Sequence, residues 1–243
     1  MKIAVIGTGL IGTQVIQRLT EAGHDATGHS RSTGVDLLTG EGLDEALSGA
    51  EVVVDVYNSP TFDEAAIDFF RTAETHALAA ARKADVRHVV ALSIVGVDQV
   101  PDVAYYRAKT LQEDLIKANP IPYSIVRAAQ FMEFIPSVLD FTTEGDVVRL
   151  PSTPVQPISS AEVAAAVAEV AAGAPLQGTR DIAGPEVFPL DELGRITLEA
   201  TGDNRHVVTD ETAGLFGAVK GDVLTAPGGH LGTTHYRDWL RTR

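Results

Sequence analysis

Short apolar runs alternate with longer segments of helical periodicity through the first half of the chain. Continuous apolar runs predict buried strands at Lys2–Ile6, Glu51–Val56 and Val86–Leu92. Apolar residues at helical spacing predict helices at Gln14–Ala22, Asp63–Ala84 and Tyr105–Ala118. Weaker patterns add strands at 24–29, 34–38 and 122–126 and a short helix at 43–47. Strands that alternate with helices predict an α/β fold with a doubly wound parallel sheet.

The pattern changes near residue 146. A strand at Val147–Leu150 precedes three closely spaced prolines, and a helix at Ala161–Ala172, a strand at Arg180–Ala183 and a helix at Asp191–Ala200 follow. We therefore expect a dinucleotide-binding domain at 1–145 and a small α+β lobe at 146–243. Clefts between lobes are common ligand sites, so we expect the lobe to bind a small-molecule substrate.

A glycine motif joins the first predicted strand to the first predicted helix. It reads Gly7-Thr8-Gly9-Leu10-Ile11-Gly12. Gly7 allows a tight turn, Gly9 allows a pyrophosphate to approach the backbone, and Gly12 allows close packing of helix on strand. Free N–H groups and the positive end of the helix dipole would receive phosphates. Because the motif lies between a strand and a helix, it predicts dinucleotide binding more strongly than a ligand-free turn.

Polar residues follow two other strands at the same expected edge of the sheet. The second strand ends at Ser30-Arg31-Ser32, where many NAD sites carry an acidic residue for the ribose. A guanidinium and two hydroxyls suit a 2′-phosphate, so we expect NADP(H) to be preferred over NAD(H), although a solvated surface turn is the alternative. Asn58 and Ser59 follow the strand at 51–56, so we expect them near the cofactor.

Composition and charge narrow the classes of partner. The formal net charge is −14, which disfavours nucleic acid, and no basic stripe offsets it. No apolar run approaches membrane-spanning length, and the N-terminus does not read as a signal peptide. The absence of cysteine fits a cytoplasmic location, and the histidines show no metal-ligand spacing, so we assign no metal.

A tyrosine and a lysine four residues apart offer acid–base chemistry. Tyr105 and Lys109 would share one helix face, just beyond the strand that ends near Ser93. A nearby ammonium would lower the pKa of the phenol, which could then exchange a proton with a carbonyl or alcohol oxygen. An exposed helix face without a role is the alternative, and a shifted helix start would present Tyr106 instead.

The chain resembles the short-chain dehydrogenase/reductase superfamily, and more closely its atypical, NmrA-like branch. The similar segments are GTGLIG, LSIVG, YYRAKTLQEDLI, PYSIVRAAQFMEF, VQPISSAEVA and DIAGPE. The resemblance implies a Rossmann core with a small C-terminal substrate lobe. It implies that the glycines bind the pyrophosphate and that Arg31 binds the 2′-phosphate. It implies that Asp36 and Leu37 lie near the adenine, and that Asn58 and Lys109 lie at the nicotinamide ribose. It also implies that Gln130 to Phe134, with Phe131 among them, line the substrate side.

These features together predict an NADP(H)-preferring oxidoreductase that moves a hydride between nicotinamide and a small, largely apolar carbonyl, enone or alcohol. Tyr105 would be the general acid or base, Lys109 its assistant and Ser93 an oxygen partner. We expect a monomer or homodimer. The alternatives are an NADP(H) sensor without turnover, and a non-redox isomerase or epimerase on the same fold.

Overall fold

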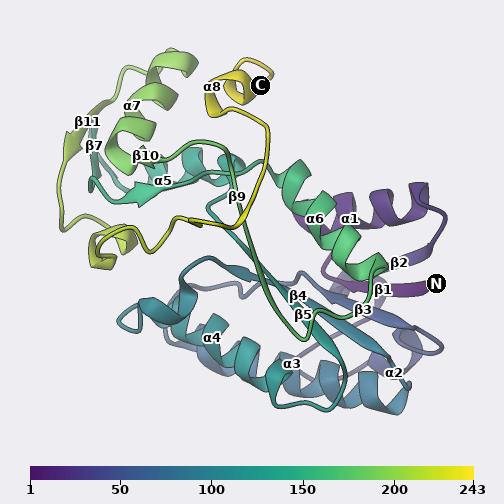
Figure 1. Ribbon diagram of the computed structural model, residues 1–243. Coiled ribbons are helices and arrows are strands. Elements are labelled where there is room, and N and C mark those ends of the chain that lie inside the picture. The colour runs from purple at the N-terminus through teal and green to yellow at the C-terminus, as the bar shows by residue number, and fades with distance from the viewer. The chain divides into compact units, whose positions relative to one another are not determined.

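The computed structural model describes residues 1–243 and contains a seven-stranded sheet (Figure 1). The strand order is β12-β9-β5-β4-β3-β1-β2. The pairs β1–β2, β1–β3, β3–β4 and β9–β12 run parallel. The strands are β1 (Lys2–Ile6), β2 (Asp25–His29), β3 (Val52–Asp55), β4 (His88–Ile94), β5 (Tyr123–Ala128), β9 (Gly178–Ala183) and β12 (His230–Leu231). The predicted α/β fold with a doubly wound parallel sheet is confirmed.

Helices cover this sheet on two faces. In Figure 1, α1 and α6 lie on one face of the strands β1 to β5, and α3 and α4 lie on the other. The helices are α1 (Leu10–Glu21), α2 (Leu43–Ala46), α3 (Ala65–Lys83), α4 (Ala104–Lys117) and α6 (Ser160–Ala172). Buried Ile6, Val53 and Val89 of three neighbouring strands belong to one apolar cluster with Ala77 of α3 and Ile116 of α4. This packing follows from the apolar runs and helical stripes of the sequence.

The predicted strand at 34–38 is wrong. Gly34 and residues 37–39 form turns, with Gly40 N donating to Asp36 O at 2.8 Å. Gly34, Gly40 and Gly42 all have positive φ angles, which a strand does not accommodate. β1 lies directly between β2 and β3. The chain reverses its winding direction at β1/β3, which is where open α/β sheets bind ligands.

The chain forms two compact units that interleave along the sequence. Unit 1 comprises Met1–Ser93, Ala104–Arg127 and Ala161–Arg180, and unit 2 comprises Ile94–Val103, Ala128–Ser160 and Asp181–Arg243. Nearly all of α6 thus belongs to unit 1, although it lies beyond residue 145. The division into domains at 1–145 and 146–243 stays a prediction.

Unit 2 is built on small sheets and three helices. Its elements are α5 (Ile135–Phe141), β6 (Thr143–Glu144), β7 (Val147–Leu150), β8 (Pro154–Val155), β10 (Phe188–Pro189), α7 (Leu190–Thr201), β11 (His206–Thr209) and α8 (Tyr236–Leu240). β7 pairs parallel with β11 and antiparallel with β6, and β8 pairs with β10. Tyr236 is fully buried, stacks on Trp239 of α8 at 5.7 Å and hydrogen-bonds Thr197 of α7 at 2.8 Å. This contact holds the end of the chain to α7.

Four short 3-10 helices complete the chain: η1 (Arg31–Thr33), η2 (Val97–Gln99), η3 (Met132–Phe134) and η4 (Leu215–Ala218). No helix is both long and apolar enough to cross a membrane.

Candidate functional site

The glycine motif forms a bare backbone cradle at the start of α1. Gly7 has φ +105°, and a Cβ on it would lie 2.7 Å from Tyr57 N, so only glycine fits beside β3. A Cβ on Gly12 would lie 1.8 Å from Gly7 O. A Cβ on Gly9 would meet nothing within 4 Å, so the space beside Gly9 is open. The space at Gly7 and Gly12 fits the predicted tight turn and close packing, and pyrophosphate binding beside Gly9 stays a prediction.

The N-terminus of α1 is left without a protein partner of its own. Gly9 is the N-cap residue, no side chain caps the helix, and no acidic residue lies in its first turn. The first N–H groups of a helix have no acceptor within the helix. Leu10 is exposed and Ile11 is buried, so one side of the turn packs against the protein and the other side faces open space. Donors without acceptors beside open space fit a phosphate group.

The segment after β2 carries an exposed cation. Arg31 Nε lies 3.4 Å from Asp36 Oδ2, and the Arg31 side chain is 72% exposed. Ser30 Oγ and Ser32 Oγ lie 2.9 Å apart, and Ser30 and Thr33 bond reciprocally as a capping box. No acidic residue ends β2 itself, but the Asp36 carboxylate forms an ion pair with the Nε side of the Arg31 guanidinium. The donors suit a 2′-phosphate if Arg31 is released from Asp36.

Asp36 and Leu37 are fixed by the turn that replaces the predicted strand. Asp36 Oδ1 accepts a hydrogen bond from Leu38 N at 2.7 Å. Leu37 O lies 2.9 Å from Nδ1 of His76 in α3. Both residues are therefore held next to the segment that carries Arg31.

Tyr105 and Asn58 meet directly in unit 1. The Tyr105 hydroxyl donates to Asn58 Oδ1 at 2.7 Å, and the same oxygen accepts from Ser59 N at 2.8 Å. Ser59 is buried and its Oγ accepts from Thr61 N at 3.2 Å. The Tyr105 ring packs edge-on against the exposed Phe62 with centroids 4.9 Å apart. The loop after β3 thus orients the phenol.

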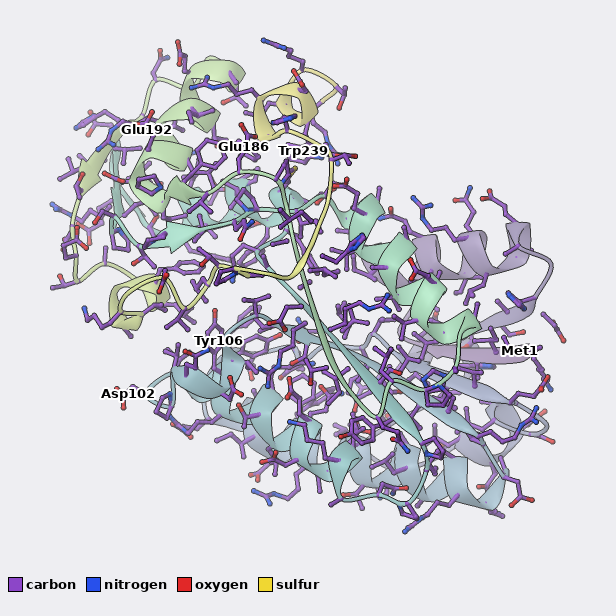
Figure 2. All side chains as sticks on the ribbon, viewed as in Figure 1. Met1, Asp102, Tyr106, Glu186, Glu192 and Trp239 are labelled. Carbon is purple, nitrogen blue, oxygen red and sulfur yellow. The ribbon has the colours of Figure 1, made fainter.

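The helix start agrees with Tyr105 rather than Tyr106. α4 begins at Ala104, and Tyr106 near its start is only 3% exposed (Figure 2). Tyr105 is half-buried and keeps its hydroxyl at Asn58. A group that must touch a substrate needs such access.

The expected effect of Lys109 on the phenol is wrong for this structure. Burial raises the pKa of Tyr105 to about 12, and the hydrogen bond to Asn58 opposes this rise only in part. Lys109 Nζ donates to Leu92 O at 2.8 Å and to Gln112 Oε1, and it lies 4.8 Å from the centroid of the Phe70 ring. The ammonium is thus engaged elsewhere, and Tyr105 is a neutral phenol at ordinary pH.

Lys109 itself is buried at only 4% exposure. Burial lowers its pKa to about 8, although the charges of Glu74, Glu113 and Asp55 oppose the fall. An ammonium has three donors, and two of them are used by Leu92 and Gln112.

Ser93, predicted as an oxygen partner of the substrate, is buried in unit 1. The residue is 4% exposed near the end of β4, and its hydroxyl oxygen has no hydrogen-bond partner. The principal partner of Glu113 is Arg127, whose Nη2 lies 2.6 Å from Oε2. A direct contact of Ser93 with substrate stays a prediction.

The residues expected on the substrate side belong to unit 2. Phe131 pairs with Ile158 in an isolated bridge, and Gln130 O accepts from Ile158 N at 2.9 Å. Phe134 packs against the exposed Phe141 with centroids 6.4 Å apart. These contacts fix the segment within its own unit.

The sequence reasoning missed three polar residues that surround Lys109. Asp55 ends β3, Glu74 lies on α3 and Gln112 lies on α4, and all three are buried. Glu74 falls on the apolar stripe of α3 formed by Phe70, Ala77 and Ala81. A carboxylate within an apolar stripe is a signal, because burying a charge is costly unless it is paired. No group of three or more His, Asp or Glu side chains is arranged to hold a metal ion.

Comparison with known proteins places this geometry among nucleotide-binding folds. Residues 7–173 match the profile of a family described as NAD(P)H-binding. No curated protein matches the sequence at a significant level. The match agrees with the resemblance to short-chain dehydrogenase/reductase proteins found in the sequence.

Solved structures share the fold at low sequence identity. A nucleoside-diphosphate-sugar epimerase from Staphylococcus aureus has a TM-score of 0.74 and 16% identity, covering 99% of this chain and 100% of that one. An NADPH-dependent quinone oxidoreductase from Escherichia coli has a TM-score of 0.67 and 18% identity, covering 99% and 98%. The Citrobacter triphenylmethane reductase complexed with NADP(H) has a TM-score of 0.65 and 20% identity, covering 86% and 79%. At such identities these likenesses establish the fold alone.

Proposed function

The chain belongs to this NAD(P)H-binding family, and we propose that it is an NADP(H)-preferring oxidoreductase acting on small, largely apolar carbonyl compounds. The observation that carries the proposal is the Tyr105–Asn58 hydrogen bond at the end of β3. It holds a neutral phenol beside the β1/β3 point where the glycine cradle opens. The nicotinamide, when bound, supplies or accepts the hydride.

The chain's own residues have separate roles in this proposal. The first-turn N–H groups of α1 bind the pyrophosphate, and Arg31 with Ser30 and Ser32 binds the 2′-phosphate. Lys109 holds the nicotinamide ribose together with Asn58. That Gln130, Phe131 and Phe134 contact the substrate stays a prediction from the sequence.

Tyr105 acts as the acid during reduction. A pKa near 12 keeps the phenol protonated, so it can give its proton to a substrate oxygen as negative charge develops there. The same pKa leaves almost no phenolate at neutral pH, and the phenolate is the form that takes a proton from an alcohol, so the proposal favours reduction over alcohol oxidation at neutral pH.

The test is NADPH consumption by the purified protein with aldehydes, ketones, enones and quinones, run beside NADPH binding followed by fluorescence. Turnover of at least one carbonyl class, faster with NADPH than with NADH, is the expected result. The absence of tight NADPH binding would contradict the whole proposal.

A second candidate is an NADP(H) sensor without turnover. The burial of Ser93 favours it, because that burial leaves no Ser93 hydroxyl open to a substrate oxygen. Tight NADPH binding with no consumption on any carbonyl would select the sensor over the reductase.

A further inference from the structure

Two carboxyl groups, of Asp55 and Glu74, are buried in unit 1. Asp55 is 2% exposed at the end of β3, and Glu74 is fully buried on α3. We call them the carboxyl pair. Two adjacent carboxylates in a dry interior cannot both ionise, so such a pair holds a proton between its members.

The hydrogen-bond partners of the two members differ. Glu74 Oε2 accepts from the Tyr57 hydroxyl at 2.7 Å and from Gln112 Nε2 at 2.9 Å. Neither oxygen of Asp55 accepts a hydrogen bond from any N–H group or hydroxyl, and its interaction partner is Glu74. Donors stabilise an ionised carboxylate, so the charge belongs on Glu74 and the proton on Asp55.

The electrostatics agree with this assignment. Burial, and then the charge of Glu74, raise the pKa of Asp55 well above its usual value. Burial also raises the pKa of Glu74, but hydrogen bonds from Tyr57 and Gln112 lower it. The charge of Glu74 therefore favours the protonated form of Asp55, and the hydrogen bonds from Tyr57 and Gln112 favour the ionised form of Glu74.

Gln112 links the carboxyl pair to Lys109. Its Nε2 donates to Glu74 and its Oε1 accepts from Lys109 Nζ, so the amide bridges anion and cation. The other titratable groups that face Lys109 are Asp55 on β3 and Glu113 on α4, and the ring of Phe70 on α3 also lies against it. Glu113 is neutralised by Arg127 and Lys117, so Glu74 is the counter-charge without a cation of its own.

We propose that Asp55 is a neutral carboxylic acid which donates its proton in a hydrogen bond to ionised Glu74, and that Glu74, through Gln112, is a positioning residue that keeps Lys109 charged and in place. The part of this that concerns Lys109 and NADPH rests on the proposed function. The protonation of Asp55 does not, since it concerns the protein without cofactor.

The protonation of Asp55 is tested on the native protein by nuclear magnetic resonance with ¹³C-labelled aspartate carboxyls. One aspartate carboxyl should keep the chemical shift of the protonated acid at neutral pH. That signal should vanish in Asp55→Asn and remain in Asp68→Asn, a matched change at an exposed position on α3. A native spectrum in which every aspartate is ionised at neutral pH overturns the assignment, whether or not the variants fold.

The role of Glu74 is tested by the pH dependence of NADPH affinity. In the native protein affinity should fall as pH rises through about 8, the pKa of Lys109. Glu74→Gln should move that midpoint to lower pH, because the nearest anion is lost, and Asp68→Asn should not move it. Asp55→Asn should keep the midpoint closer to the native value, because an amide N–H can replace the acid proton at Glu74.

Two results of this titration overturn the proposal. A midpoint in Glu74→Gln equal to that of Asp68→Asn removes the role of Glu74. A larger displacement in Asp55→Asn than in Glu74→Gln places the charge on Asp55 instead. If the native protein does not bind NADPH, the proposed function and the role of Lys109 fail together, while the carboxyl signal decides the protonation of Asp55 separately.

Discussion

The buried and the open parts of the candidate site differ in what their residues contact. Lys109, Glu74 and Gln112 are each nearly inaccessible and contact one another. Arg31 and Phe62 are exposed, and Tyr105 lies between the two parts with its hydroxyl at Asn58. Removing the partner of a buried polar group lowers the free energy of unfolding, whereas an exposed polar group contributes mainly when a ligand binds to it. Changes in the buried part should therefore affect both folding and binding, and changes in the open part should affect kinetics or selectivity alone.

The largest kinetic effect is expected at the boundary between the two parts. Tyr105→Phe removes the proton donor and should lower kcat by about 100-fold to 10,000-fold. The Kd for NADPH and the unfolding midpoint should change little, because one hydrogen bond at a half-buried site is lost. Steady-state kinetics beside denaturant unfolding measure both quantities. Tyr106→Phe is the matched change, and a greater kcat loss there would transfer the acid role to Tyr106.

Lys109→Met should combine loss of binding with loss of stability. Removing the cation leaves the charge on Glu74 without compensation, which should cost about 3 kcal/mol of unfolding free energy. Urea unfolding gives this value, and NADPH titration should show weaker binding. Lys117→Met on the same helix should cost less than about 1 kcal/mol, since that lysine is partly exposed. Equal costs at the two positions would contradict the contrast between buried and open regions.

The pH dependence should separate Lys109 from Tyr105. Burial lowers the pKa of Lys109 to about 8, so its charged form predominates below that pH and is lost above it. NADPH affinity should therefore fall as pH rises through about 8. The pKa of Tyr105 is about 12, so kcat at saturating NADPH should show no loss from phenol ionisation near pH 8. A kcat that falls with the same midpoint as affinity would show that one group controls both.

Arg31 should control cofactor selectivity without affecting stability. Arg31→Ala should reduce the preference for NADPH over NADH by about tenfold, because a charge-assisted contact to the 2′-phosphate is lost. Asp36→Asn should increase the preference, because it releases the guanidinium from its ion pair. The ratio of kcat/KM for the two cofactors is the measurement. An unchanged ratio in both variants would remove Arg31 from the 2′-phosphate site.

Phe62 should produce the smallest effect. Its ring packs against Tyr105 and is 46% exposed, so it is available to a substrate. Phe62→Ala should raise KM for aromatic carbonyls by about threefold, and Phe62→Leu should raise it less. Aliphatic carbonyls should be affected less than aromatic ones. An equal increase for both substrate classes would indicate a general disturbance of Tyr105.

The local features of the fold and cradle could be predicted because nearby residues decide them. The apolar run Lys2–Ile6 and the glycines at 7, 9 and 12 define a strand, a turn and a helix start within a dozen residues. The structure gives each glycine the space its role requires. The strand predicted at 34–38 failed because Gly34 has a positive φ angle and residues 37–39 form turns, which outweigh a weak apolar signal.

The environment of Tyr105 and Lys109 could not be predicted in this way. Helical spacing places both residues on α4, but it does not show which groups other elements bring beside them. Asp55 lies 54 residues before Lys109 in the chain, and Glu74 lies 35 before it. Their approach depends on β3, α3 and α4 packing together.

By itself the sequence determined the α/β class, the glycine cradle and the pairing of a tyrosine with a lysine on one helix. Each of these depends on backbone preferences and periodicity, which act over a few residues. The tertiary structure decided the strand order at β1, the neutral state of Tyr105 and the surroundings of Lys109. Charge states in a protein interior depend on desolvation and on partners from distant segments, and only the folded chain brings those together.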